Sequence, residues 1–278
     1  MVAVLTPDLL NPYFNEIIRG IEERAWTAGL VTSVMEVLPG PDACHATAEW
    51  VRAERVRGSV VFGGIFTNDE LRGFAASRGA PLVAINQVTD DRDVLCINID
   101  YAMAMQQVTT HLLELGHRRI VFVAGSGHSA TSLEKERGIR QAMAQRGLEL
   151  RDEDVLPGAA TVEWGFQAMS SLLARPAAAR PTAVIGACDL IALGVLHAVR
   201  CGQLSVPRDV SVVGFDDIAM ACHANPPLTT ISPPKPGMGR LAVDLIFRGA
   251  DSRPPAVSSF IMLESPLVVR ESTARVLE

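Results

Sequence analysis

Short apolar runs alternate along the chain with longer segments in which apolar residues recur at helical spacing. The first run covers residues 2–5. Asn11 and Pro12 then suit an N-cap and a first helical position, and Gly29 suits the end of that helix. The same order predicts strands over residues 59–62, 82–85, 96–99, 120–124, 183–187 and 210–215, and helices over residues 69–78, 102–115, 133–146 and 190–200. Short apolar strands separated by helices indicate an α/β fold with parallel sheets covered on both faces.

Two short sequences recur at one offset. Arg19-Gly20-Ile21 returns as Arg137-Gly138-Ile139, and Gly29-Leu30 returns as Gly147-Leu148, 118 residues later in both cases. Such pairs also arise by chance, but their matched positions after predicted strands favour two similar Rossmann-like lobes. Two open parallel sheets whose carboxyl ends face each other form a cleft for a small ligand.

Composition narrows the class of protein. The chain has 278 residues, 48% hydrophobic and 20% charged, which suggests about two domains or one domain of two lobes. A net charge of −6 argues against a surface that holds DNA directly. The five cysteines never stand in C-x-x-C spacing, which is typical of reduced thiols. With no signal peptide and no apolar run of about 20 residues, we expect a cytoplasmic protein that does not contact membranes.

The motifs of common enzymes are missing from the sequence. It has no phosphate-binding loop, no H-E-x-x-H and no G-x-S-x-G. The turn after the first predicted strand, residues 6–11, has no glycine, which argues against a dinucleotide site. The six histidines have no metal-ligand spacing. We therefore expect no catalytic residues, no cofactor and no metal.

Polar and aromatic residues at predicted strand ends are the best candidates for ligand contacts. Asp216 and Asp217 follow the strand over residues 210–215, and we expect Asp216 to face a ligand and Asp217 to cap the next short helix. Tyr13 and Phe14 follow the first strand and are able to stack on a ring. For Phe14, packing in the core is the stronger alternative, because it lies on the apolar stripe of its helix.

Several longer segments resemble one known family. They are Asn11-Pro12-Tyr13-Phe14, residues 115–120 (LGHRRI), residues 206–217 (VPRDVSVVGFDD), residues 226–231 (PPLTTI) and residues 267–273 (LVVREST). Together, in this order and over nearly the whole chain, they resemble the effector-binding core of the LacI/GalR transcription regulators. The resemblance implies a periplasmic-binding-protein-like fold of type I, with two lobes joined by three crossovers.

The same resemblance implies where the lobes divide. The crossovers are expected near residues 98–100, 232–236 and 256–260. The N-terminal lobe then comprises residues 1–99 plus 235–256, including a returning helix over residues 237–249. The C-terminal lobe comprises residues 100–234 plus 257–278. The helix-turn-helix head of the family is absent from these residues, so we expect operator DNA to be bound only through such a head.

The ligand site implied by the resemblance departs from the family pattern at several positions. Tyr13, Phe14 and Asp216 match positions that contact the effector, and Asp189 matches a second-lobe pattern residue. Lys135 stands where arginine is usual, Cys188 where asparagine is common, Asn86 where aspartate is common, and Pro233 where glutamine is common. These exchanges make the expected site less polar and favour a smaller or more apolar effector, or a degenerate site, over an ordinary monosaccharide.

The helix predicted over residues 190–200 is apolar nearly all round, so it needs cover on more than one side. Burial against its own sheet is one explanation. The resemblance implies a homodimer, in which we expect Leu193 and Ala224 at the interface. An effector that contacts both lobes would then favour the closed state of the cleft. A transport solute-binding protein and an enzyme with an interlobe cleft remain the alternatives.

Overall fold

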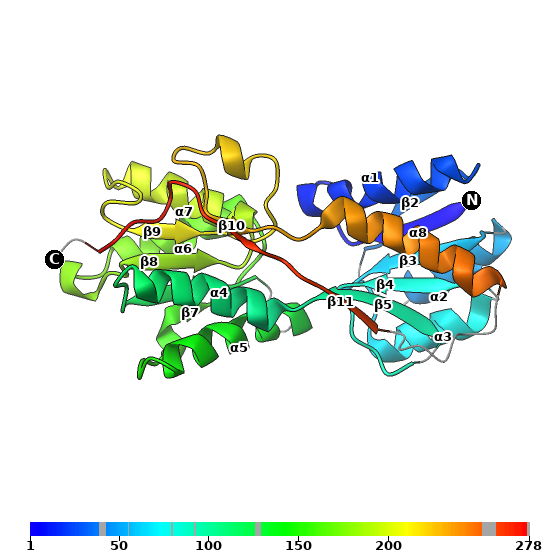
Figure 1. The fold of residues 1–278 in the computed structure, drawn as a ribbon, viewed down its shortest axis with the longest axis horizontal. Coiled ribbons are helices and arrows are strands. Elements are labelled where there is room, and N and C mark those ends of the chain that lie inside the picture. The colour runs from blue at the N-terminus through cyan, green and yellow to red at the C-terminus, as the bar shows by residue number, and fades with distance from the viewer. Residues whose placement is uncertain are drawn as a thin grey trace. The chain divides into compact units, whose positions relative to one another are not determined.

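A computed structural model describes residues 1–38, 43–54, 56–78, 80–91, 93–125, 129–251 and 260–276 of the chain. The chain divides into two compact units (Figure 1). Unit 1 comprises Met1–Ile99 and Pro234–Glu264, and unit 2 comprises Asp100–Pro233 and Ser265–Glu278. Each unit has a parallel sheet with helices packed on it, which confirms the predicted α/β class.

Unit 1 is built on a six-stranded sheet in the order β11-β5-β4-β3-β1-β2, and every neighbouring pair is parallel. Its strands are β1 (Val2–Thr6), β2 (Thr32–Glu36), β3 (Gly58–Phe62), β4 (Leu82–Ile85), β5 (Val94–Ile99) and β11 (Phe260–Leu263). Its helices are α1 (Pro12–Thr27), α2 (Ala43–Ala53), α3 (Asn68–Arg78) and α8 (Lys235–Asp251).

The helices of unit 1 pack in pairs. Helices α1 and α8 lie side by side, and α8 also contacts β3, β4 and β5 (Figure 1). Helices α2 and α3 contribute Val51 and Phe74 to an apolar cluster with strand residues such as Leu5 and Val61. The inner strands β1, β3 and β4 are therefore buried, as their continuous apolar runs predict.

Unit 2 is built on a four-stranded parallel sheet in the order β7-β6-β8-β9. Its parallel strands are β6 (Ile120–Val123), β7 (Val155–Leu156), β8 (Ala183–Gly186) and β9 (Ser211–Val213), and β10 (Thr230–Ile231) pairs antiparallel with β12 (Leu267–Val268). Its helices are α4 (Tyr101–Glu114), α5 (Ala130–Ala144), α6 (Val162–Leu173) and α7 (Asp189–Cys201), with 3-10 turns η1 (Asp152–Asp154), η2 (Ala177–Ala179) and η3 (Ala221–His223). Helix α4 packs on α5, and α6 packs on α7.

The start and end signals of the helices act as the sequence predicts. The Asn11 side chain accepts a hydrogen bond of 3.0 Å from the backbone N–H of Tyr13 and so caps α1. Gly29, Gly116 and Gly147 follow helices and have φ angles of +71°, +93° and +69°. Glycine adopts this left-handed conformation without a steric penalty, so each of these residues ends its helix cleanly.

The internal repeat marks the same structural role in each unit. A Cβ atom at Gly20 of α1 would lie 2.2 Å from the Pro236 carbonyl oxygen of α8. A Cβ atom at Gly138 of α5 would lie 2.2 Å from the Ala102 carbonyl oxygen of α4. Both glycines therefore allow a close helix crossing, which explains why the two segments share a sequence.

The third expected crossover is corrected by the sheet. Residues 256–259 of that segment lie outside the described residues. Phe260–Leu263 forms β11 and pairs with β5, with Phe260 opposite Cys96, so residues 260–264 belong to unit 1 and not to the second lobe. Pro234 also falls in unit 1. A short apolar run does not reveal which sheet it joins, because the partner strand lies far away in the sequence.

The sequence pattern missed β2, β7, α2 and α6. All residues of β2 are half-buried or exposed, and β7 has two residues, so neither shows a continuous apolar run.

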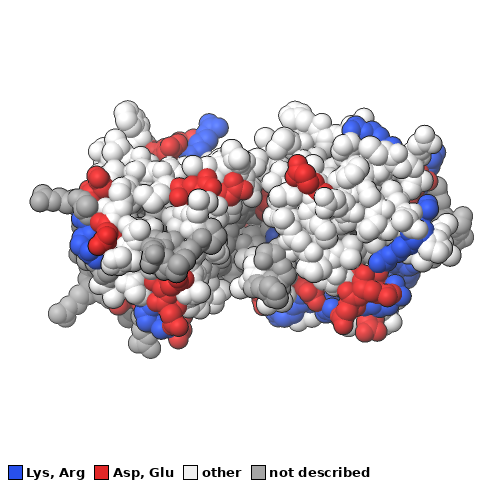
Figure 2. All heavy atoms as spheres, turned by 180° about the vertical axis from the view of Figure 1, so that it is seen from behind, with Lys and Arg blue, Asp and Glu red and all other residues white. Residues whose placement is uncertain are grey.

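The surface and the helix lengths add two observations. On the face shown in Figure 2, basic and acidic side chains are intermingled. Within the described part of the chain, no helix is both long and apolar enough to cross a membrane.

Candidate functional site

The sheet order of each unit indicates where a ligand would bind. In unit 1 the strand order reverses between β1 and β3, and in unit 2 it reverses between β6 and β8. Open parallel sheets bind ligands at the carboxyl ends of strands beside such a reversal.

In unit 1 the structure brings Tyr13, Phe14 and Asn86 into one group. Tyr13 lies in the first turn of α1 and is buried, and its hydroxyl accepts a hydrogen bond of 2.7 Å from the Asn86 amide nitrogen. The Phe14 ring lies 5.4 Å from the Tyr13 ring and 5.0 Å from the Phe62 ring, measured between centroids. Phe14 thus packs against the core, which is the stronger alternative given for it in the sequence analysis, but its side chain is only half-buried.

Asn86 follows β4 and is held in an uncommon conformation. Its φ angle is +60°, in the left-handed region that asparagine tolerates better than most residues. Its amide nitrogen is occupied by Tyr13, but its side-chain oxygen is buried and has no hydrogen-bond partner among the described residues. Leaving a buried acceptor unpaired costs about 1–3 kcal/mol, and a donor on a ligand would remove that cost.

In unit 2 the central feature is the buried ammonium group of Lys135. It donates a hydrogen bond of 2.7 Å to the Ala187 carbonyl oxygen, in the turn between β8 and α7. It also lies 3.8 Å from the centroid of the Phe215 ring and 5.2 Å from that of Tyr101. Burial lowers the pKa of Lys135, while the negative charge of Asp216 opposes this shift. Neighbouring aromatic rings and a carbonyl thus stabilise a largely buried cation.

Asp216 and Cys188 lie near this ammonium group. Asp216 follows β9 with a φ angle of +107°, and its backbone N–H donates to the Ile231 carbonyl oxygen at 3.0 Å. Cys188 precedes α7 and makes no side-chain capping bond. Burial, followed by the charge of Asp216, raises the pKa of Cys188 to about 12, so the thiol stays protonated and adds little polarity.

Asp189 and Asp217 form hydrogen bonds and an ion pair within unit 2 that stabilise its fold. Asp189 is fully buried, and its two oxygens accept hydrogen bonds from the Thr230 hydroxyl at 2.6 Å and the Ile218 N–H at 2.8 Å. Asp217 forms an ion pair of 2.7 Å with Arg270. The prediction that Asp217 caps the next short helix was wrong, because Met220 is the cap residue of η3 and Arg270, far along the chain, binds the carboxylate.

Two residues of the unit 2 group were missed by the sequence analysis. The Tyr101 and Phe215 rings stack with centroids 5.7 Å apart and lie beside Lys135. Phe215 directly precedes Asp216, the expected ligand contact, and Tyr101 directly follows Asp100, which caps α4. Nothing in the sequence indicates that these rings meet.

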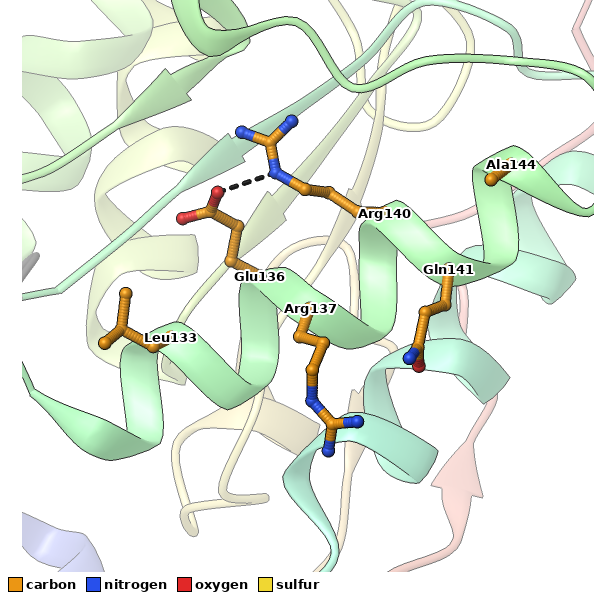
Figure 3. Close-up of a pocket in the computed structure, with 6 residues that line it drawn as sticks. All are labelled: Leu133, Glu136, Arg137, Arg140, Gln141 and Ala144. Atoms are coloured by element: carbon orange, nitrogen blue, oxygen red, sulfur yellow. Dashed lines mark hydrogen bonds and ion pairs between the residues drawn. The ribbon is translucent and has the colours of Figure 1, made fainter.

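The outer face of α5 carries a shallow groove that is a poorer candidate. Figure 3 shows its lining residues, Leu133, Glu136, Arg137, Arg140, Gln141 and Ala144. Arg140 is already paired with Glu136 at 2.7 Å and with Asp152 at 2.8 Å, and Arg137 is paired with Glu134. Because these exposed charges satisfy one another, the groove offers a ligand little that water does not.

Leu193 and Ala224, the expected dimer contacts, are both half-buried. Leu193 lies on α7 between fully or nearly fully buried neighbours such as Ala192 and Val195. Their place in an interface stays a prediction.

Comparison with known proteins gives a consistent result. A model of the periplasmic binding protein-like domain matches residues 109–273. The HTH-type transcriptional regulator MalR of Streptomyces coelicolor is 32% identical, and the match covers 99% of this chain and 80% of the regulator.

Two solved structures share the fold. A LacI family transcriptional regulator from Enterococcus faecium with bound ribose has a TM-score of 0.88 and 23% identity over 99% of both chains. The lac repressor dimer bound to operator and the anti-inducer ONPF has a TM-score of 0.86 and 24% identity, covering 98% of this chain and 93% of that one. This chain belongs to the LacI/GalR family of transcriptional regulators and forms their periplasmic binding protein-like effector-binding core.

Proposed function

We propose that the chain senses a small sugar-like metabolite that binds between its two units. In unit 1 the ligand contacts Tyr13, Phe14 and Asn86, and in unit 2 it contacts Lys135, Cys188 and Asp216. One observation carries this proposal: each unit has an incompletely paired polar group at the carboxyl ends of its parallel strands, the Asn86 oxygen after β4 in unit 1 and the Lys135 ammonium, bonded to Ala187 after β8, in unit 2. The ribose in the Enterococcus faecium regulator supports a sugar-like ligand.

Ligand binding then controls transcription by shifting a conformational equilibrium. A ligand that contacts both units favours their closed arrangement, and a coupling of about 1–3 kcal/mol to DNA binding is typical of such systems. Operator DNA is bound by a helix-turn-helix head, as the name of MalR indicates for that regulator. The lac repressor dimer supports a homodimer as the acting unit. Acting on DNA, the protein works in the cytoplasm.

A thermal-shift screen of sugars, nucleosides and small acids tests ligand binding. A ligand at ten times its Kd stabilises the folded state by about 1.4 kcal/mol, which raises the Tm of a chain of this size by about 3–5 °C. The hit is then titrated against Asp216→Asn and Asn86→Ala. Asn86→Ala removes a hydrogen bond to the ligand, and Asp216→Asn replaces a charged acceptor oxygen by an NH2 donor, so we expect the Kd to rise about 10-fold or more in each case.

The matched control is Gln141→Ala, a change on the outer face of α5, which leaves the Kd unchanged. A hit that binds the two site variants and the wild type equally would contradict the proposed site.

A further inference from the structure

The Lys135 ammonium group has more hydrogen-bonding capacity than unit 2 uses. An ammonium group has three N–H donors. Among the described residues, the Ala187 carbonyl oxygen is its one hydrogen-bond acceptor, and Asp216 and Asp189 act on it through their charge without a direct ion pair. The Phe215 and Tyr101 rings stabilise the positive charge in part, but the face of a ring is a weaker partner than an anion. The group is therefore a buried cation without a counter-ion in contact.

Such a cation is costly for the fold. A charge removed from water without a paired anion costs several kcal/mol, and an apolar side chain of similar size usually fits better. Arg137, on the exposed side of the same helix α5, differs from Lys135 because it forms an ion pair with Glu134. A buried and unpaired Lys135 is explained if its counter-ion arrives with the ligand.

The neighbouring Asp216 limits what that ligand is. Its negative charge acts on Lys135, Cys188 and Asp189, so it lies within electrostatic range of the incoming group. A carboxylate is an acceptor and calls for a ligand hydroxyl. A phosphate, with a charge of about −1.5 to −2 at neutral pH, would be repelled by Asp216 more than a single Lys135 offsets. A carboxylate on the ligand carries one charge, which Lys135 neutralises.

We propose that the effector is a hydroxy acid, such as a sugar acid, whose carboxylate pairs with Lys135 and whose hydroxyl donates to Asp216. The inference rests on the proposed function and narrows its ligand class. Lys135 would pair with the carboxylate as a compact point charge, without the two-pronged planar contact that arginine makes. Lys135 and Asp216 are both buried, and each keeps 8% of its surface exposed.

The test compares acids with their neutral partners by isothermal titration calorimetry. The probes are D-gluconate with D-glucitol, D-galacturonate with D-galactose, and glycerate with glycerol, together with glucose 6-phosphate. We expect at least one acid to bind wild-type protein about 100-fold more tightly than its neutral partner. Lys135→Met removes that preference, and Lys135→Arg keeps most of it. Arg137→Met, which removes a positive charge from the exposed side of the same helix, leaves it unchanged.

The outcomes separate this inference from the proposed function. Tighter binding of a neutral partner or of the phosphate overturns the hydroxy acid, as does an acid preference that survives in Lys135→Met. If no acid binds but a neutral compound from the wider screen does, with weaker binding by Asp216→Asn, the inference fails and the proposed function stands. If no compound of any class binds, both fail. A melting curve of Lys135→Met verifies folding, and its Tm is expected to equal or exceed that of the wild type.

Discussion

At the scale of single residues, unit 2 assigns different tasks to two aspartates that look alike in sequence. Asp216 lies beside Lys135, whereas both oxygens of Asp189 are used by Thr230 and Ile218. The sequence indicates that Asp216 faces a ligand, because it directly follows an apolar strand. The sequence does not reveal that Asp189 is fixed by a threonine 41 residues away, since that contact depends on how β10 meets the start of α7. The same holds for the rings of Tyr101 and Phe215.

The buried Asp189 carboxyl makes stability depend on pH. Burial, followed by the charge of Asp216, raises the pKa of Asp189 from 3.8 to about 8. Between these values the unfolded chain has lost the proton and the folded chain still holds it, so the free energy of unfolding falls as the pH rises. The decline is at most about 1.4 kcal/mol per pH unit and is complete above the folded pKa.

Asp189→Asn removes this titration. The free energy of unfolding of wild type and Asp189→Asn is measured with urea at pH 5, 7 and 9. We expect wild type to lose stability relative to Asp189→Asn up to about pH 8. Above that pH the difference between the two proteins is expected to stay constant. The charges of Lys135 and Asp216 are present in both proteins and largely cancel in the comparison. Parallel profiles across the whole range would show that Asp189 is ionised in the folded state already near pH 5.

At the scale of elements, the helix pairs depend on small residues at their crossings. Gly20 and Gly239 make room between α1 and α8, Gly165 and Gly194 between α6 and α7, and Gly138 between α5 and α4. The repeated Arg-Gly-Ile sequence predicted matched positions, and the structure shows the shared cause. The pattern found long, strongly apolar elements well. It missed β2, whose residues are half-buried or exposed, and it missed α6 although Thr161 caps that helix.

Replacing one crossing glycine tests this role. The Cβ atom of Gly138→Ala would stand 2.2 Å from the Ala102 carbonyl oxygen, so α4 and α5 must move apart. We expect a loss of about 1–3 kcal/mol in the free energy of unfolding. Gly73→Ala is the matched control, because Gly73 also lies in a helix but has open space around it. That change is expected to stabilise by about 0.5–1 kcal/mol through helix propensity alone. Equal effects of the two substitutions would exclude a steric role for Gly138.

At the scale of the whole molecule, the chain passes from unit 1 to unit 2 at Ile99, returns at Pro234 and leaves again at Glu264. A unit made of separated segments cannot be found from local patterns, because those patterns do not say which sheet a strand joins. The resemblance to a family supplied this connectivity, and its one clear error lies at β11, whose partner β5 is more than 150 residues earlier in the chain. Leu193 and Ala224, the expected dimer contacts, are likewise half-buried in the single chain, so local patterns do not define an interface.

The proposed homodimer is tested by a charge at its expected interface. Leu193→Glu places a carboxylate where we expect apolar contact with a second copy, so the dimer is expected to weaken by about 100-fold or more. Leu133→Glu is the control, because Leu133 is 54% exposed on the outer face of α5, away from the expected interface. Sedimentation velocity at micromolar concentration should show dimers for wild type and Leu133→Glu and monomers for Leu193→Glu, with melting curves confirming that all three are folded. A monomeric wild type would remove the dimer from the proposed function, and a dimeric Leu193→Glu would place its interface elsewhere on the molecule.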